Sequence, residues 1–258
     1  MTITGERIIT NAGGFNPTWQ RHTANYKFAA TLLPERANGA KVADLGCGTG
    51  HAAHYLGDRW SVGVDLDQSA LAQQSRPGVR ADFGRLPFAD GSFDAIVCLH
   101  AIEHVPYPER VVAECARIVA PGAPVIMATP NRLTFGRPDE IIDPYHDIEY
   151  DPEQLRALLA ASFSRVTVYG LTGSARYMDF YARERKRLNL LLAMDPLKLR
   201  RYVPRRAKQV LYDWGLTKAR SRPDPLASSI ELDDFGLSQE NLPESLDLIA
   251  VASNEPES

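Results

Sequence analysis

The stretch Val42-Ala43-Asp44-Leu45-Gly46-Cys47-Gly48-Thr49-Gly50 decides the fold of this chain. An apolar run ends in three alternating glycines, and an acidic residue stands two positions before the first of them. Glycine has no Cβ and adopts positive φ, so such a loop lets the backbone come very close to a ligand. In parallel α/β sheets, ligands bind outside the carboxyl ends of the strands. The pattern therefore predicts a buried first strand followed by a ligand-binding loop.

The spacing of the glycines indicates which kind of ligand the loop binds. A dinucleotide fingerprint reads G-x-G-x-x-G, whereas His51 stands at the third glycine position here and the spacing is G-x-G-x-G. No Gly-Lys-Ser/Thr sequence follows, so the loop is not a Walker A loop. A zwitterionic nucleoside that carries a positive charge fits better, because Asp44 can meet an ammonium group. Asp65 ends a second predicted strand and can accept both ribose hydroxyls, although it would suit NAD equally well.

Three further segments agree with this interpretation: Ala81-Asp82-Phe83, residues 86–94 (LPFADGSFD) and Pro121-Gly122. With them, the chain resembles the class I S-adenosylmethionine (SAM)-dependent methyltransferases of the methyltransferase type 11 group, over about residues 40–170 and the final strand. The resemblance implies SAM as the cofactor. It places the residues that bind SAM at the ends of the first four strands: Asp44, Gly46, Cys47, Gly48, Gly50, Asp65, Leu66, Asp82, Phe83, Leu99 and His100.

The expected fold is an α/β, Rossmann-like sheet of seven strands, mostly parallel, with an antiparallel last strand and helices on both faces. Its strands are predicted at 41–45, 60–65, 79–82, 93–99, 123–129, 165–171 and 246–252, and its helices at 50–57, 67–75, 108–119 and from Pro152 onward, with Asp151 as N-cap. We expect three parts: an N-terminal lid at 1–40, a SAM-binding domain at 41–172 with 241–253, and a helical insertion at 173–240.

The predicted insertion is strongly basic. Residues 176–222 hold 14 Lys and Arg against 4 Asp and Glu, although the whole chain has a net charge of −3. Three interpretations remain open: a solvated face of a helical cap, a surface for an anionic substrate or acidic partner, and contact with a membrane surface. The acceptor is expected to be a small molecule or saccharide, with an anionic one left open. A homodimer is also left open.

Composition excludes several classes of protein. The slightly negative net charge argues against a general nucleic-acid binder. None of the apolar runs approaches the ~20 residues of a membrane span, and the start of the chain, MTITGER, lacks the apolar stretch of a signal peptide. Cys47, Cys98 and Cys115 are odd in number and have no metal-type spacing. We therefore expect reduced thiols, no transmembrane segment and a cytoplasmic protein.

Polar side chains directly follow the predicted fourth strand. If His100, Glu103 and His104 lie in a helical turn, they share one face, and three potential metal ligands cluster there. In methyltransferases that resemble the ubiquinone O-methyltransferase, this stretch reads Glu-x-x-Glu-His and is associated with a divalent metal such as Mg²⁺. Here His100 replaces the first Glu. Since Mg²⁺ prefers oxygen, a softer ion or a pocket without metal remains open.

The other histidines are assigned by position. His146 follows the predicted fifth strand, where a histidine can act as a general base because it titrates near neutrality, with Asp143, Asp147 or Glu149 to orient it. We therefore expect His146, His104 and Glu103 to serve catalysis. His51 and His54 are predicted on the first turn of a helix, as structural residues or neighbours of the cofactor. His22 lies in a segment that could form a lid over the cofactor.

A second resemblance concerns the acceptor. Residues 129–135, 143–146 and Glu149, with segments near both ends of the chain, resemble actinobacterial methyltransferases linked to polymethylated polysaccharides. Those enzymes methylate sugar hydroxyls. The first hypothesis is therefore O-methylation of a sugar or another hydroxylated small molecule, helped by a histidine base or a metal. The alternatives are C- or N-methylation of a lipid, quinone or amine, and a SAM-binding regulator without activity.

Overall fold

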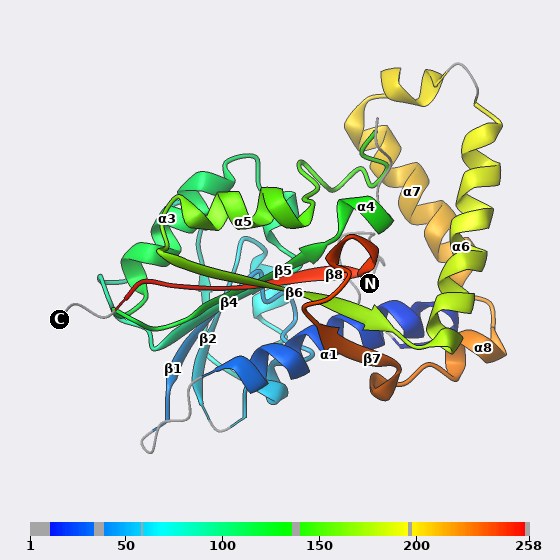
Figure 1. The fold of residues 1–258 in the computed structure, drawn as a ribbon. Helices are drawn as coiled ribbons and strands as arrows, with labels where there is room; N and C mark the ends of the chain where they lie inside the picture. The colour runs from blue at the N-terminus through cyan, green and yellow to red at the C-terminus, as the bar shows by residue number, and fades with distance from the viewer. Residues whose placement is uncertain (1–10, 34–38, 58, 136–139, 196–197, 256–258) are drawn as a thin grey trace. The chain divides into compact units, whose positions relative to one another are not determined.

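The computed structural model describes residues 11–33, 39–57, 59–135, 140–195 and 198–255 (Figure 1). The chain divides into two compact units. The first, the helical unit, comprises Met1–Arg21, Ile142–Tyr145 and Gly173–Gly236. The second, the sheet unit, comprises His22–Ile141, His146–Thr172 and Leu237–Ser258. Each unit is described by itself below.

An eight-stranded sheet in the order β3-β2-β1-β4-β5-β8-β6-β7 organises the fold. The strands are β1 Lys41–Leu45, β2 Trp60–Asp65, β3 Gly78–Arg80, β4 Ala95–Leu99, β5 Val125–Pro130, β6 Arg165–Gly173, β7 Phe235–Ser238 and β8 Asp247–Ser253. β1 to β5 pair in parallel, whereas β8 lies between β5 and β6 and runs antiparallel to both. The predicted class and the mostly parallel sheet are confirmed.

The predicted number of seven strands is wrong, because β7 adds an eighth at the edge beyond β6. β7 is only four residues long, contains a glycine, and is mostly half-buried, with the burial pattern Biii. Its sequence therefore lacks both the length and the strict alternation by which a half-buried strand is identified.

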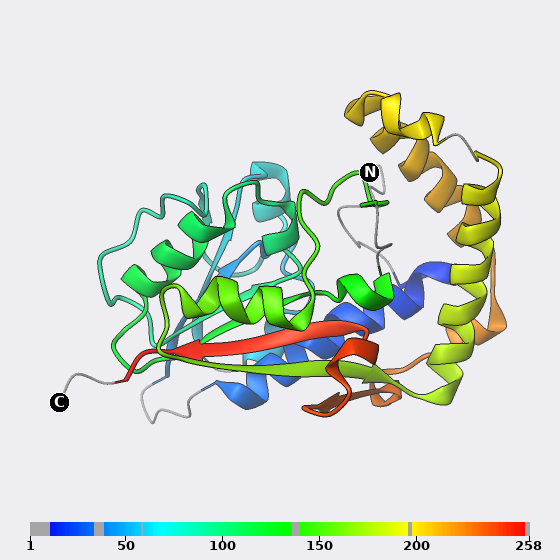
Figure 2. The same cartoon turned by 45° about the horizontal axis from the view of Figure 1, so that its top comes forward.

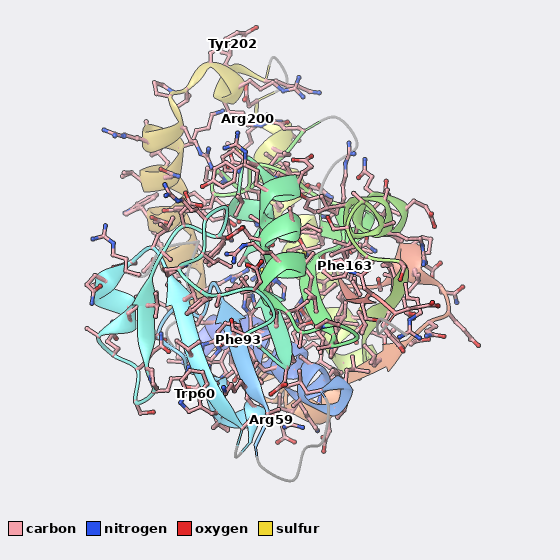
Figure 3. All side chains as sticks on the ribbon, turned by 90° about the vertical axis from the view of Figure 1, so that its left-hand side faces the viewer. Arg59, Trp60, Phe93, Phe163, Arg200 and Tyr202 are labelled. Carbon is pink, nitrogen blue, oxygen red and sulfur yellow. The ribbon has the colours of Figure 1, made fainter. Side chains whose placement is uncertain are left out.

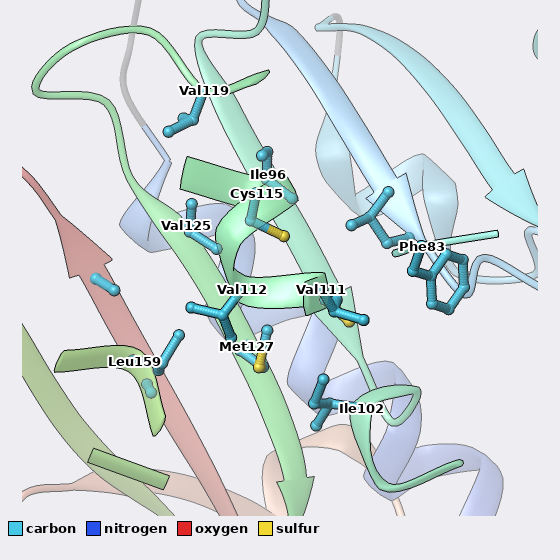
Figure 4. Close-up of a cluster of buried hydrophobic side chains, with 14 of the residues drawn as sticks. Phe83, Ile96, Ile102, Val111, Val112, Cys115, Val119, Val125, Met127 and Leu159 are labelled. Atoms are coloured by element: carbon cyan, nitrogen blue, oxygen red, sulfur yellow. The ribbon is translucent and has the colours of Figure 1, made fainter. Parts of the chain in front are cut away.

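The two faces of the sheet bury alternate residues of each strand, as the period of two requires. Ala43 and Leu45 join the apolar cluster on one face, whereas Val42 joins the cluster on the other. The first cluster, shown in part in Figure 4, is covered by α3 Pro108–Ile118 and α5 Pro152–Ala160. The C-terminal part of α1 Asn16–Leu32 covers the opposite face. Apolar burial on both sides thus holds the parallel strands in one layer.

Helix boundaries follow the capping residues where these are strong. α5 begins as predicted, because the Asp151 side chain accepts the N–H of Gln154 while the Gln154 side chain accepts that of Asp151, and Pro152 occupies the first turn. The helix predicted at 50–57 is wrong. It is replaced by a short 3₁₀ helix, Ala53–Leu56, between Gly50 and Gly57, which both adopt positive φ. The helix predicted at 67–75 shrinks to α2 Gln68–Leu71.

The helical unit consists of α6 Ala175–Ala193, the 3₁₀ turn Leu199–Tyr202, α7 Arg205–Arg220 and α8 Pro225–Ser228, with the 3₁₀ turn Gly13–Phe15 (Figure 2). Polar contacts join its segments. The Asn16 amide donates to the carbonyls of Ala227 and Ile230 at 2.8 and 2.9 Å, and Arg176 pairs with Asp234 at 2.6 Å. None of the helices in the described ranges is long and apolar enough to cross a membrane.

Candidate functional site

The glycine loop after β1 is built so that only glycine fits at its first position. Gly46 has φ +75°, and a Cβ on it would lie 2.3 Å from the Cβ of Ala101. Its N–H donates to the Val64 carbonyl at 2.8 Å, which ties the loop to the end of β2. Gly48 also has positive φ, but a Cβ there would meet no atom of the described residues within 4 Å. The loop therefore packs against Ala101 at Gly46, whereas it is open at Gly48.

Asp65 links this loop to the end of β2. One of its carboxylate oxygens accepts the N–H of Gly48 at 2.9 Å, and the other accepts the N–H of Asp67 at 2.8 Å. A carboxylate oxygen can accept more than one hydrogen bond, so both oxygens keep capacity for ligand hydroxyls. The open space at Gly48 and the carboxylate beside it fit a nucleoside bound across the ends of β1 and β2, as the sequence predicts.

Asp44 lies in a different environment from the one the sequence suggests. Its carboxylate is fully buried, forms an ion pair with the guanidinium of Arg76, and accepts a hydrogen bond from the Tyr26 hydroxyl at 3.1 Å. Burial raises the pKa of Asp44, and the Arg76 charge opposes that rise. The Asp44 carboxylate is therefore already paired with a guanidinium of the protein. Arg76, distant in sequence and in an irregular segment, gave no pattern from which this pair could be predicted.

The remaining residues expected to bind SAM lie close to the same edge. Cys47 is buried beside the Gln74 amide, 3.0 Å from its sulfur, and burial followed by the Asp44 charge raises its pKa to about 12. Asp82 is exposed and accepts the Tyr107 hydroxyl at 2.7 Å. Of the others, Gly50, Leu66 and Phe83 follow β1, β2 and β3, Leu99 ends β4, and His100 comes directly after it. Leu66 is 57% exposed, whereas Phe83 and Leu99 are buried.

His100 does not begin a helical turn shared with Glu103 and His104. It adopts φ +53°, a rare conformation for a residue with a side chain, and the turn that follows is the 3₁₀ helix Ile102–His104. The predicted common face of the three residues is therefore wrong. The His100 ring instead stacks on His22, with centroids 4.0 Å apart, and its Nε2 lies 3.4 Å from the carboxylate of Asp247.

Two buried carboxylates raise the pKa of His100. Burial alone would lower the pKa of the ring, but Asp247 first and Glu103 next raise it to about 9. The His100 Nδ1 lies 3.6 Å from an oxygen of Glu103. Sequence reasoning missed Asp247, which also accepts the Asn25 amide at 2.8 Å. The signal was present, because an aspartate between leucines in a strand that is buried along most of its length needs a partner.

A second cluster forms where the loop after β5 returns to β4. Glu103, His104 and His146 each offer one ligand atom, and these atoms lie within 4.8 Å of one another. The loop is held there because the N–H groups of Asp147 and Ile148 donate to the Glu103 carbonyl at 2.8 and 3.2 Å. The structure thus brings two of the predicted ligands together with His146 instead of His100.

The charges around Glu103 keep it ionised. Burial would raise the pKa of its carboxyl, but the hydrogen bond with His100 and the neighbouring His104 lower it to about 2. The Thr129 hydroxyl donates to Glu103 at 3.1 Å. Thr129 begins the segment 129–135, and the sequence indicated no role for this residue by itself. The cluster therefore contains one permanent carboxylate beside two imidazoles.

Glu149, one of the three acids considered for orienting His146, contacts it. The Nδ1 of His146 lies 3.2 Å from one oxygen of Glu149, and the two side chains are only 6% and 2% exposed. Asp143 accepts the Tyr212 hydroxyl at 2.9 Å within the helical unit. The second Glu149 oxygen and the Tyr150 hydroxyl are buried and have no hydrogen-bond partner among the described residues. Buried polar atoms of this kind are rare in folded proteins and are often found where a water, ion or ligand binds.

A cavity of about 780 Å³ adjoins these residues between α3 and α5. Among the described residues, four carboxylates and one guanidinium line it, from Glu109, Glu140, Asp147, Glu149 and Arg132, together with apolar side chains such as Ile148 and Leu158. Glu149 therefore belongs both to the wall of the cavity and to the contact with His146.

The two histidines that follow the glycine loop are His51 and His54. Burial, and then the charge of His54, lower the pKa of His51 to about 4, so this ring stays neutral. His54 is exposed within the 3₁₀ helix Ala53–Leu56. The prediction that both lie on the first turn of an α-helix is wrong, because the segment does not continue as one.

Comparison with known proteins indicates a family for this chain. Residues 43–127 match the family described as a methyltransferase domain. A probable S-adenosylmethionine-dependent methyltransferase of Mycobacterium tuberculosis is 36% identical over 193 residues, which cover 71% of this chain and 69% of the relative. A similarly named protein of Mycolicibacterium smegmatis is 29% identical, and the aligned region covers 98% of this chain and 95% of that relative.

A solved structure shows the same fold. A SAM-dependent methyltransferase from Thermotoga maritima superposes with a TM-score of 0.62 at 16% identity, and the superposition covers 93% of this chain and 92% of that structure's chain. The sheet, the open glycine loop and the sequence similarity over most of the chain lead to one conclusion. The chain belongs to the class I SAM-dependent methyltransferases, and SAM is its cofactor.

Proposed function

We propose that the enzyme transfers the methyl group to a hydroxyl of a sugar or another hydroxylated small molecule, with His146 as the general base. The observation that carries this proposal is the buried contact between His146 Nδ1 and Glu149, at 3.2 Å. With Nδ1 directed at a carboxylate, Nε2 is left to accept a proton, and the carboxylate stabilises the imidazolium that forms.

The chemistry explains why a base points to a hydroxyl. The sulfonium of SAM supplies the methyl group and leaves as a neutral thioether. The acceptor oxygen bonds to the methyl carbon as the carbon–sulfur bond breaks, so acceptor and donor must be held in line. A carboxylate or phenolate acceptor has no proton to lose, whereas an aliphatic hydroxyl must give up its proton as attack proceeds. His146 takes that proton in our proposal.

The cofactor is proposed to lie along the ends of β1 to β4. Asp65 accepts the ribose hydroxyls, the open backbone at Gly48 faces the amino-acid tail, and Asp82 with Phe83 lines the adenine side. The open space at Gly48 and the position of Asp65 support this assignment. Asp44 acts from beneath the loop through its pair with Arg76 and does not contact the ligand ammonium.

Gly48 offers a test of this placement. Alanine at Gly48 adds a methyl group to the open side of the loop, and we expect SAM affinity to fall at least about tenfold, measured by calorimetry. Gly91→Ala is the matched control, because Gly91 has φ +62° and, among the described residues, a Cβ there would meet only the Ala120 Cα at 3.9 Å. Both variants carry a similar strain of about 1–2 kcal/mol. Equal affinities in the two variants would contradict the placement.

The acceptor is proposed to be neutral and rich in hydroxyls. Among the described residues in the wall of the cavity beside Glu149, four carboxylates stand against one guanidinium, which disfavours an anionic acceptor and suits hydrogen bonding to hydroxyl groups. The resemblance to enzymes that methylate sugar hydroxyls points the same way, and two relatives come from mycobacteria.

Incubation with methyl-labelled SAM tests the acceptor class. Purified enzyme is supplied separately with neutral glucan oligosaccharides, with simple phenols and with primary amines. We expect label in the oligosaccharides, at a position that alkali does not hydrolyse, as for a methyl ether. Label in the amines or phenols alone would contradict the proposal and support the alternative chemistries.

A metal-assisted reaction is the second candidate, because of the cluster of Glu103, His104 and His146. One carboxylate and two imidazoles fit Mn²⁺, Fe²⁺ or Zn²⁺ better than Mg²⁺, which prefers oxygen ligands. A bound ion would supply Lewis acidity. In that case His146 would be a ligand and could not serve as the base, so the two mechanisms exclude each other.

Metal removal distinguishes the mechanisms. If His146 is the base, enzyme treated with EDTA and desalted keeps its activity, and elemental analysis of the protein as purified finds no stoichiometric ion. If the cluster holds a metal, EDTA abolishes activity, Mn²⁺ or Zn²⁺ restores it, and His104→Ala lowers the metal content. His54→Ala is the control, because this histidine is exposed and outside the cluster.

A further inference from the structure

A row of large apolar side chains lies exposed on α7. Val210, Leu211 and Trp214 are 68%, 62% and 64% exposed, and their spacing places them on one face of the helix. The turn before α7 adds Leu199 and Tyr202, at 60% and 85% exposed. These five residues are called the α7 surface below. Figure 3 shows Tyr202 at the end of its turn.

The position of α7 within the helical unit is fixed by its other side. The Tyr212 hydroxyl donates to Asp143 at 2.9 Å, and the Tyr145 hydroxyl donates to Asp213 at 2.6 Å. Arg205 donates to the carbonyl of Pro144 at 3.0 Å. The α7 surface is therefore the outward side of a helix that is already anchored, and no other described segment of the helical unit covers it.

Basic residues frame the α7 surface. Lys218 lies over the Trp214 ring, with its ammonium 4.8 Å from the centroid, and Arg206 is exposed one helical turn before Val210. They belong to the segment 176–222, in which 14 Lys and Arg stand against 4 Asp and Glu, an excess of ten positive charges. A partner on this surface must therefore be apolar at its centre and negatively charged around it.

An anionic lipid bilayer has this combination of properties. Helices that lie in the membrane interface carry Trp, Tyr and Leu on the buried side and Lys or Arg around them, and aromatic rings favour the headgroup level. A second copy of the chain would bring the same excess of positive charge against itself. We propose that the α7 surface docks the enzyme on anionic membranes as a peripheral protein. The inference goes beyond the proposed methyl transfer and does not depend on it.

Flotation with lipid vesicles tests the docking. The full chain is mixed with vesicles of phosphatidylcholine and phosphatidylglycerol in equal parts, or of phosphatidylcholine alone. We expect binding to the first kind, weakening with added salt, and little binding to the second. Each basic residue near the surface contributes roughly fivefold to the partition coefficient, so Arg206→Glu with Lys218→Glu is expected to lower it by more than tenfold.

Matched variants distinguish membrane binding through the α7 surface from nonspecific adsorption of the protein to vesicles. Trp214→Gln removes the largest apolar group and is expected to lower partitioning at least tenfold, whereas Trp60→Gln, at a residue 51% exposed at the start of β2, leaves it unchanged. Arg85→Glu is the charge control in the sheet unit. Equal binding by Trp214→Gln and the wild type would overturn the proposal. Equal binding to neutral and anionic vesicles would also overturn it. The same holds if sedimentation shows a dimer that Trp214→Gln dissociates while vesicle binding persists.

Discussion

Replacing His146 with alanine lowers the rate of methyl transfer by about 10²–10⁴-fold, the usual contribution of a general base, and leaves the affinity for SAM unchanged. The reason is its place in the site. His146 lies after β5 and contacts Glu149, whereas the residues proposed to hold SAM lie at the ends of β1 to β4. Single-turnover rates with labelled SAM measure the loss, and calorimetry measures the affinity.

Two variants control this result. Glu149→Gln keeps the size of the side chain but removes its charge, so we expect a smaller loss of rate and an altered pH profile. His54→Ala removes an exposed histidine that takes part in neither cluster, and should retain wild-type activity. A His146→Ala enzyme with near wild-type turnover would refute the role of His146 as the base.

The sequence predicted the parts of the fold that follow from local pattern. The glycine loop, the buried first strand and the capped start of α5 depend on residues close together in the chain, and the structure shows each of them. Elements held mainly by distant contacts were missed or misjudged. β7 pairs only at the sheet edge. The segment after Gly50 was misjudged for a local reason, because Gly50 and Gly57 both adopt positive φ and the residues between them form only a short 3₁₀ helix.

The candidate site shows the same division. Position after a strand end was enough to nominate His100, Glu103 and His146, because the carboxyl ends of parallel strands share one edge. The partner of each residue was not predictable. His100 turns toward Asp247 because of its positive φ, and Glu149 is selected because the loop after β5 hydrogen-bonds to the Glu103 carbonyl. Both depend on backbone geometry that a linear motif does not encode.

Asp65→Ala is expected to lower the affinity for SAM by about a hundredfold or more. Hydrogen bonds to a charged group contribute about 1.5–3 kcal/mol each, and two ribose hydroxyls lose their acceptor in this variant. The loop also loses the contact that holds Gly48, at 2.9 Å. Calorimetric titration of the purified variant with SAM measures the change, and a thermal melt shows whether the protein stays folded.

Asp67→Ala is the matched control, because it removes an acid two residues away that caps α2 through the N–H of Ser69 at 2.7 Å. We expect it to cost about 1 kcal/mol of stability and to leave SAM affinity close to that of the wild type. The pair separates ligand binding from folding: a carboxylate that only braced the loop would change the melt more than the affinity. Wild-type affinity in a folded Asp65→Ala protein would show that the ribose is held elsewhere.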